Sequence, residues 1–227
     1  MIKPLSRVAI STALILAWPA AHAADGQKIF TQGGQNPAAM ACLGCHGADG
    51  KGIAAAGFPR LAGLPAGFPR LAGLPAGYLN KQLGDFRKGS RKQAVMEPLA
   101  KALSEEEAKA VSAYLANMPG DPAPEQRRQQ IATDPVTRLA LYGDWSRHIP
   151  GCVQCHGPGG SGVGEHFPPL AGQPASYLVA QLNAWRDGSR SNDPNQLMVG
   201  VAKAMTDAEV TAVAAFFAET GSQEVKP

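Results

Sequence analysis

The apolar and polar positions of this chain predict helices and no strands. Two segments carry apolar residues on one face at helical spacing. These residues are Val111, Leu115 and Met118 in the first segment, and Val210, Val213 and Phe217 in the second. Each segment opens with a capping box, Ser104 with Glu107 and Thr206 with Glu209, and should end near Met118 and Thr220. Further helices are predicted over 26–32, 78–87, 136–145 and 177–187. We therefore expect an all-α fold.

The same order of segments occurs twice along the chain. The string CLGCHGADGKG is matched by CVQCHGPGGSG, and FPRLAGLPAGYLNKQLGDFRKGSR is matched by FPPLAGQPASYLVAQLNAWRDGSR. A repeat of this length predicts a duplicated domain. We expect domains over 24–118 and 131–221, joined by a linker over 119–130 that is rich in proline and glycine at its start.

The N-terminal residues 1–23 have the pattern of a cleaved secretory signal. Lys3 and Arg7 precede an apolar run over 8–18, which is followed by the small-residue site Ala21-His22-Ala23. The alternative is a membrane anchor, but this run is shorter than the roughly 20 residues that span a bilayer. Export to the periplasm is therefore predicted.

Charge divides unevenly between the two repeats. Residues 24–120 carry 11 basic and 7 acidic side chains, whereas residues 121–227 carry 8 and 11. Such an asymmetry could orient docking on a charged partner. No basic cluster of the kind that binds nucleic acid occurs, so no nucleic-acid partner is expected.

All four cysteines lie in the strings CLGCH (42–46) and CVQCH (152–156). C-x-x-C-H is the motif for c-type haem attachment, in which Cys42 with Cys45, and Cys152 with Cys155, form thioethers to one porphyrin each. His46 and His156 then lie over the two irons as axial ligands. A shared Cys₄ zinc site and a thioredoxin-like redox pair are alternatives. The separation of the pairs and the absence of a strand context argue against them.

The other axial ligand can be sought among the remaining side chains. The first repeat has no second histidine, which leaves methionine as the usual alternative. Met40 is too near the cysteines to reach the opposite haem face. Of the others, Met96 aligns with Met198, whereas Met118 aligns with Thr220. We therefore predict Met96 and Met198 as iron ligands; His166 could compete in the second repeat but is expected to be a surface or hydrogen-bonding histidine.

These motifs, in this order and over nearly the whole chain, resemble the dihaem cytochrome c4 family. Each repeat has C-x-x-C-H-G, then F-P-x-L-A-G-x-x-x-x-Y-L-x-x-Q-L, then G-S-R and a late Met. The resemblance implies two tandem class I cytochrome c domains, with the haem propionates meeting near a pseudo-twofold interface. It implies that the proline of F-P-x-L, Pro168 in the second repeat, accepts a hydrogen bond from the axial histidine. Arg91 and Arg190 are candidates for propionate contact; the alternative is a solvated arginine at a helix end.

The family implies a periplasmic electron shuttle that feeds a terminal oxidase and often associates loosely with the membrane. We expect a monomer that receives single electrons from a cytochrome bc1-type or dehydrogenase donor. Two six-coordinate His/Met irons leave no open position, so we expect no enzymatic activity. The alternatives are an electron-exit subunit of a periplasmic dehydrogenase and a dihaem enzyme for peroxide or thiosulfate.

The chain departs from the pattern in one place, where GFPRLAGLPA occurs twice in succession over 57–76. Phe68 to Tyr78 has the same ten-residue spacing as Phe167 to Tyr177, although the first copy fits the upstream spacing. We predict that Phe68, Pro69 and Leu71 of the second copy pack on the first haem, and that the first copy, 57–66, forms an extra surface loop.

Overall fold

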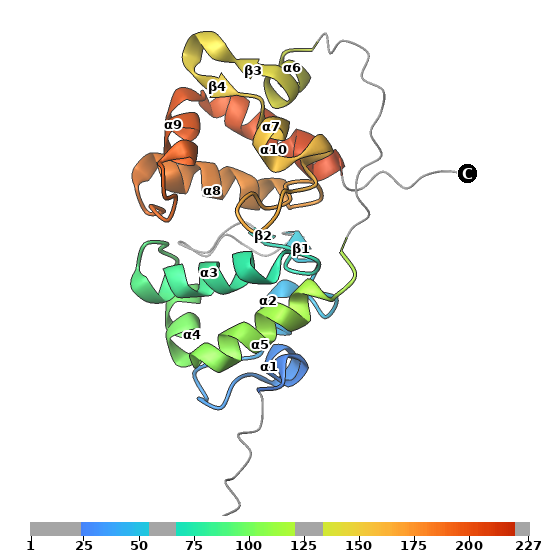
Figure 1. The fold of residues 1–227 in the computed structure, drawn as a ribbon, viewed down its shortest axis with the longest axis vertical. Coiled ribbons are helices and arrows are strands. Elements are labelled where there is room, and N and C mark those ends of the chain that lie inside the picture. Colours follow the sequence, from blue (N-terminus) through green and yellow to red (C-terminus); the bar gives the residue numbers. More distant parts are fainter. Residues whose placement is uncertain (1–23, 55–66, 121–133, 221–227) are drawn as a thin grey trace, which may run out of the picture.

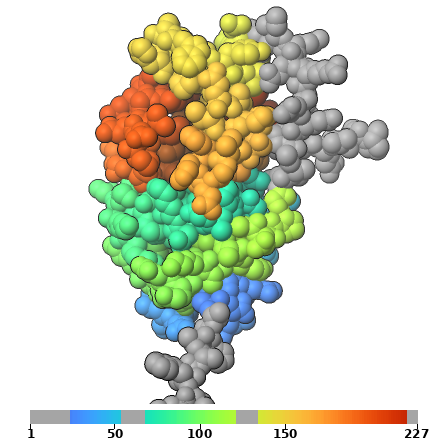
Figure 2. Space-filling model, viewed as in Figure 1, coloured from blue at the N-terminus to red at the C-terminus, as the bar shows by residue number. Residues whose placement is uncertain are grey.

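The computed structural model describes residues 24–54, 67–120 and 134–220. The predicted signal 1–23, most of the predicted linker and the first copy of the decamer lie outside these residues. Two helical halves are stacked along the long axis of the molecule, with the first half blue to green and the second yellow to red (Figure 1). In the space-filling view the two halves touch directly (Figure 2).

The first half is built from five helices and one short strand pair within its described residues. Its helices are α1 Gly26–Gln32, α2 Leu43–His46, α3 Ala76–Lys88, α4 Met96–Ala102 and α5 Glu105–Ala116. The buried core lies between α1, α3 and α5. It consists of Ile29, Phe30, Leu74, Tyr78, Leu79, Val111 and Leu115. The predicted apolar face of α5 therefore packs inward, because its residues repeat at the helical period.

The second half repeats this arrangement with a core of its own. Its helices are α6 Pro135–Tyr142, α7 Cys152–His156, α8 Ala175–Asp187, α9 Leu197–Ala204 and α10 Asp207–Thr220, with short 3₁₀ turns η1 Trp145–Arg147 and η2 Pro158–Gly160. The core includes Leu139, Ile149, Val210, Val213 and Phe217. Because each half buries its own apolar cluster, the duplication seen in the sequence is a duplication of packing units.

Both predicted capping boxes are present. Ser104 accepts a hydrogen bond from the backbone N–H of Glu107, whose carboxylate accepts from the N–H of Ser104. Thr206 and Glu209 exchange the same two bonds at the start of α10. These reciprocal bonds satisfy backbone donors that a helix start leaves unpaired.

The expectation that strands are absent was wrong. Two antiparallel pairs of two residues each occur: β1 Ile53–Ala54 with β2 Gly67–Phe68, and β3 Gly143–Asp144 with β4 Ile149–Pro150. A ladder of two residues is too short to produce an alternating apolar pattern. The helix predicted over 136–145 is shorter in the structure. It ends at Tyr142, because β3 begins at Gly143. Gly143 has φ of 78°, and a side chain on it would meet the carbonyl of Ile149.

The strand pair of the first half decides which decamer copy corresponds to the second repeat. Ile53 pairs with Phe68, and the aligned Val163 forms an antiparallel bridge with Phe167. Phe68 therefore occupies the position of Phe167. Three residues (164–166) separate the bridge partners in the second half, and fourteen (54–67) separate them in the first.

Within the described residues, no helix is long and apolar enough to cross a membrane.

Candidate functional site

Each C-x-x-C-H string forms one turn of helix. In the first half the backbone N–H groups of Cys45 and His46 both donate to the carbonyl of Cys42, at 3.2 and 3.0 Å. The cysteines are partly buried, and the histidines are buried, with His46 6 % and His156 8 % exposed. Each turn thus carries one buried imidazole and two partly buried thiols.

A proline carbonyl fixes the orientation of each imidazole. His46 Nδ1 lies 3.0 Å from the oxygen of Pro69, and His156 Nδ1 lies 2.8 Å from the oxygen of Pro168. A carbonyl oxygen can only accept, so the proton is on Nδ1 and the lone pair is on Nε2. Burial lowers the pKa of both histidines, which keeps them neutral, while the proline carbonyl opposes that shift. Neutral imidazole with a bare Nε2 is the form that binds iron.

A phenylalanine lies edge-on beside each of these histidines. The ring centroids of His46 and Phe68 are 6.2 Å apart, and those of His156 and Phe167 are 6.1 Å apart. Both the phenylalanine and the hydrogen-bonding proline of the first half therefore come from the second decamer copy. Leu71 is partly buried against the first core.

The four thiols are free and lie as two separate pairs. Burial raises the pKa of the Cys42 and Cys152 thiols to about 11. Each pair stands on its own helix, α2 or α7, in a different half of the molecule. No group of three or more His, Cys, Asp or Glu side chains converges within the described residues. The geometry does not assemble the shared Cys₄ zinc site that the sequence left as an alternative.

The predicted methionine ligands occupy equivalent places at the starts of α4 and α9. Both side chains are partly buried. The N–H of Met96 donates to Gln93 Oε1 at 2.7 Å, and the N–H of Met198 donates to Asp193 Oδ2 at 2.6 Å. In contrast, Met118 packs against the first core and Met205 is part of the second. These two rival methionines already have a packing role.

Arg91 and Arg190 are not solvated, as one reading of the sequence allowed; they are 7 % and 5 % exposed. The helices α3 and α8 face each other between the halves (Figure 1). Arg91 and Arg190 follow the ends of these helices, and their backbones form an antiparallel bridge. Arg91 donates to Gln82 of its own half, and to the Tyr177 hydroxyl and Gln181 Oε1 of the other, at 2.8 to 2.9 Å. Arg190 donates to the same two glutamines, at 2.9 Å to Gln181 and 3.3 Å to Gln82.

The glutamines and tyrosines of this interface are functional candidates that the sequence motifs did not single out. Tyr78 with Gln82, and Tyr177 with Gln181, are four residues apart and so share one face of α3 or α8. The Y-L-x-x-Q spacing, which occurs in both repeats, is the sequence feature that could have predicted this shared face. Burial raises the pKa of Tyr78, which therefore stays neutral.

These charges test whether the site suits a haem. No carboxylate among the described residues forms an ion pair with Arg91 or Arg190, which donate hydrogen bonds to neutral amide and hydroxyl oxygens. Two buried guanidinium groups side by side are costly unless anions are nearby. Burial and the neighbouring Arg91 both lower the pKa of Arg190. Haem propionates are anions, so the residues present fit this cofactor.

The comparisons agree with this geometry. The Cytochrome c family profile matches residues 23–119 and 145–220, one match in each half. The chain therefore belongs to the cytochrome c family. Its tandem halves each carry one covalently bound c-type haem, and it is a dihaem electron carrier.

Two relatives and one solved structure show which members of the family this chain resembles. The chain is 57 % identical over 221 residues to the thiosulfate dehydrogenase electron acceptor of Stutzerimonas stutzeri (strain A1501), covering 97 % of this chain and 96 % of that protein. It is 33 % identical over 203 residues to cytochrome c4 of Thiocapsa roseopersicina, covering 86 % and 95 %. A solved structure, thiosulfate dehydrogenase (TsdBA) from Marichromatium purpuratum, has a TM-score of 0.68 and 43 % identity over 85 % of this chain and 39 % of that one.

Proposed function

We propose that this chain is a periplasmic dihaem cytochrome that accepts single electrons from a thiosulfate dehydrogenase and passes them to a respiratory acceptor such as a terminal oxidase. The observation that carries the electron-transfer role is the repetition of the histidine–proline arrangement in both halves, with distances of 3.0 and 2.8 Å. The similarity at 57 % identity to a thiosulfate dehydrogenase electron acceptor supports this choice of donor.

The residue roles belong to the same proposal. The thioethers come from Cys42 and Cys45 in the first domain (24–118), and from Cys152 and Cys155 in the second (131–221). The axial pairs are His46 with Met96 and His156 with Met198. The haem supplies the one-electron couple of its iron. The chain orients each imidazole through a proline carbonyl, which raises the basicity of the ligand. The buried Arg91 and Arg190 would hold the propionates.

We propose further that the chain is not itself an enzyme, because two His/Met irons offer no open coordination position. It acts as an exported monomer that associates loosely with the membrane. Electron entry and exit take place through small, short-lived contacts with protein partners. The excess of basic residues in the first half and of acidic residues in the second orients those contacts.

The test is anaerobic rapid mixing of the oxidised chain with thiosulfate and a purified thiosulfate dehydrogenase. We expect reduction of both haems, two electrons per chain, and no reduction when the enzyme is omitted. Rates should fall as salt is raised, because the docking is charge-guided. Reduction by thiosulfate alone would contradict the non-enzymatic role. Reduction no faster than that of an unrelated c-type cytochrome would contradict the choice of donor.

The onward step has its own test. Membranes that contain a terminal oxidase should reoxidise the reduced chain and consume oxygen at the matching rate. Oxygen consumption that is unaffected by added chain would exclude the oxidase as acceptor, and would leave the donor result unchanged.

A further inference from the structure

Trp185 carries a buried hydrogen-bond donor that the protein does not satisfy. Its indole Nε1 is inaccessible to solvent and has no hydrogen-bond partner among the residues that the structure describes. An indole N–H can only donate. A buried donor without an acceptor is rare in folded proteins, because it has lost its hydrogen bonds to water and gained none in return. The position therefore calls for an acceptor that the described part of the chain does not supply.

The first half has no equivalent donor. The aligned residue is Phe86, which is 6 % exposed. The surroundings are otherwise repeated: Arg91 Cζ lies 4.5 Å from the centroid of the Phe86 ring, and Arg190 Cζ lies 4.0 Å from that of Trp185. The two halves thus hold an arginine over an aromatic ring in the same way, and only the second adds an N–H.

The location of Trp185 indicates what the acceptor is. The residue is four positions after Gln181 and eight after Tyr177, and so lies on the face of α8 that carries the interface cluster. It also lines a cavity of about 500 Å³, together with Arg190 and with Val199, the neighbour of Met198. Trp185 therefore shares one cavity with Arg190, the proposed propionate contact, and with the start of the helix that carries the predicted axial methionine.

Among the groups of a bound haem, only the propionate carboxylates can accept this bond, because iron occupies the porphyrin nitrogens. We propose that Trp185 Nε1 donates to a propionate of the second haem, and that this bond, absent from the first half, makes the two haems electrochemically different. The inference rests on the haem placement given above, in which His156 and Met198 bind the second iron.

The consequence for the reduction potential follows from charge. An ionised propionate stabilises ferric iron, and an N–H donor offsets part of its negative charge. Trp185 therefore raises the potential of the second haem. The same bond stabilises the ionised carboxylate and lowers its pKa. The second haem should consequently show a weaker dependence of potential on pH near neutrality than it would without the indole.

The first test uses the exported holoprotein in its reduced state, with isotope-labelled tryptophan. Two indole N–H signals are expected, from Trp145 and Trp185. Trp145 is 64 % exposed and serves as the internal control. We expect the Trp185 proton to exchange with solvent much more slowly than the Trp145 proton. Equal exchange rates would overturn the proposal.

The second test replaces Trp185 by the residue of the other half. In Trp185→Phe we expect a lower potential at the haem that responds to Met198→Ala, a stronger pH dependence of that potential, and no change at the other haem. Trp145→Phe is the matched control and should change neither. An unchanged potential of the second haem would overturn the proposal. Together with slow exchange of the Trp185 indole proton, that result would mean that a buried water accepts the bond. If the oxidised wild-type protein showed no methionine–iron charge-transfer band, that result would instead contradict the haem placement.

Discussion

The two halves of this molecule share one plan and differ in how they complete it. Both place a buried histidine 2.8 to 3.0 Å from a proline carbonyl and a methionine at the start of a short helix. They differ at Leu74 and its counterpart Gln173, at Phe86 and Trp185, and in the support of the last helix. The shared features are the proposed haem ligands and their hydrogen bonds, whereas the differences lie at the interface, beside the buried arginines and at the start of the last helix. The two halves therefore repeat the histidine–proline arrangement and differ in the side chains around it.

The strongest way to break the comparison is to remove one haem. The double variant Cys152→Ser with Cys155→Ser should lose the second haem, because no thioether can form. Mass spectrometry should find one haem per chain in place of two. The first haem should keep its spectrum, since the first half has a core of its own. Cys42→Ser with Cys45→Ser is the mirror variant, and loss of both haems from either would mean that the halves do not hold their cofactors independently.

The axial methionines give the next largest effect. Met96→Ala and Met198→Ala should each remove half of the charge-transfer band of methionine-ligated ferric haem and lower one of the two potentials, because methionine ligation raises the potential. The control variants Met118→Leu and Met205→Leu conserve core volume. They should leave both bands intact, and a band lost in a control variant would transfer the ligand role to that methionine.

Gln173 tests the asymmetry of the interface. Its side chain accepts from the N–H of Arg70 at 3.1 Å and donates to the carbonyl of Arg70 at 2.9 Å, which joins the halves. Gln173→Leu installs the residue found at Leu74 and removes both bonds. Because they are buried, we expect a loss of about 2 kcal/mol in the free energy of unfolding, measured by denaturant titration. Gln154→Leu, at an exposed position, should change it by less than about 0.5 kcal/mol.

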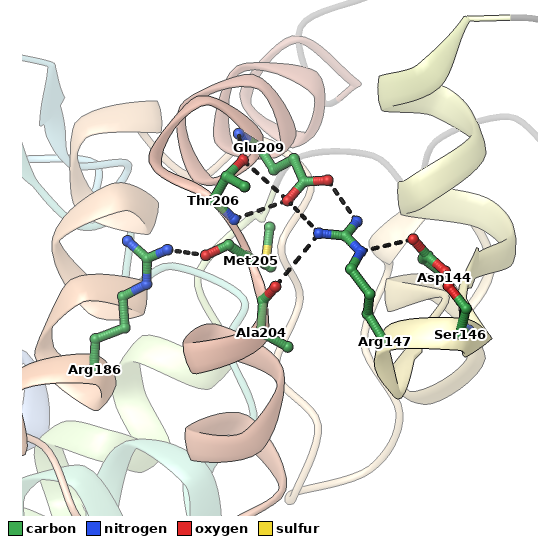
Figure 3. Close-up of polar contacts among 8 residues, drawn as sticks. All are labelled: Asp144, Ser146, Arg147, Arg186, Ala204, Met205, Thr206 and Glu209. Atoms are coloured by element: carbon green, nitrogen blue, oxygen red, sulfur yellow. Dashed lines mark hydrogen bonds and ion pairs between the residues drawn. The ribbon is translucent and has the colours of Figure 1, made fainter.

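The smallest effect concerns the start of α10. Arg147 makes a two-pronged ion pair with Glu209, at 2.6 and 3.0 Å, and also binds Asp144 (Figure 3). Glu107, the counterpart of Glu209, instead accepts from the backbone N–H of Gln35. Glu209→Gln keeps a capping side chain but removes the charge. Since the pair is partly exposed, we expect a loss of roughly 0.5 to 1 kcal/mol at neutral pH.

The pH dependence gives this prediction its sign. Hydrogen bonds from Arg147 lower the pKa of Glu209 from 4.5 to about 2. A carboxylate whose pKa falls on folding stabilises the folded state above its unfolded pKa, and this contribution is lost as it becomes protonated. The difference in unfolding free energy between the wild-type protein and Glu209→Gln should therefore shrink as the pH falls from 4.5 to 2. A constant difference over that range would mean that the charge is not the cause.

Much of the fold could be predicted because it is written locally. The capping boxes and the helices over 26–32, 78–87 and 177–187 depend on residues three or four positions apart, and each is present in the structure. The strand pairs escaped prediction because Ile53 with Phe68, and Gly143 with Pro150, meet through loops and have no periodic pattern of their own. The helix predicted over 136–145 was too long, because the helix in the structure ends before Gly143, a glycine that the strand pairing requires.

By itself, the sequence determined that there are two units, that each carries C-x-x-C-H, and that methionines occupy matching places. These are statements about residue type and spacing, which covalent attachment and helical periodicity translate directly into structure. The tertiary structure decided which decamer copy lies beside His46, that Arg91 and Arg190 are buried against each other, and that the indole of Trp185 lacks an acceptor. Those facts depend on burial and on contacts between residues far apart in the chain. Some of these contacts lie within one half, as between His46 and Pro69, and others cross between the halves, as between Arg91 and Gln181.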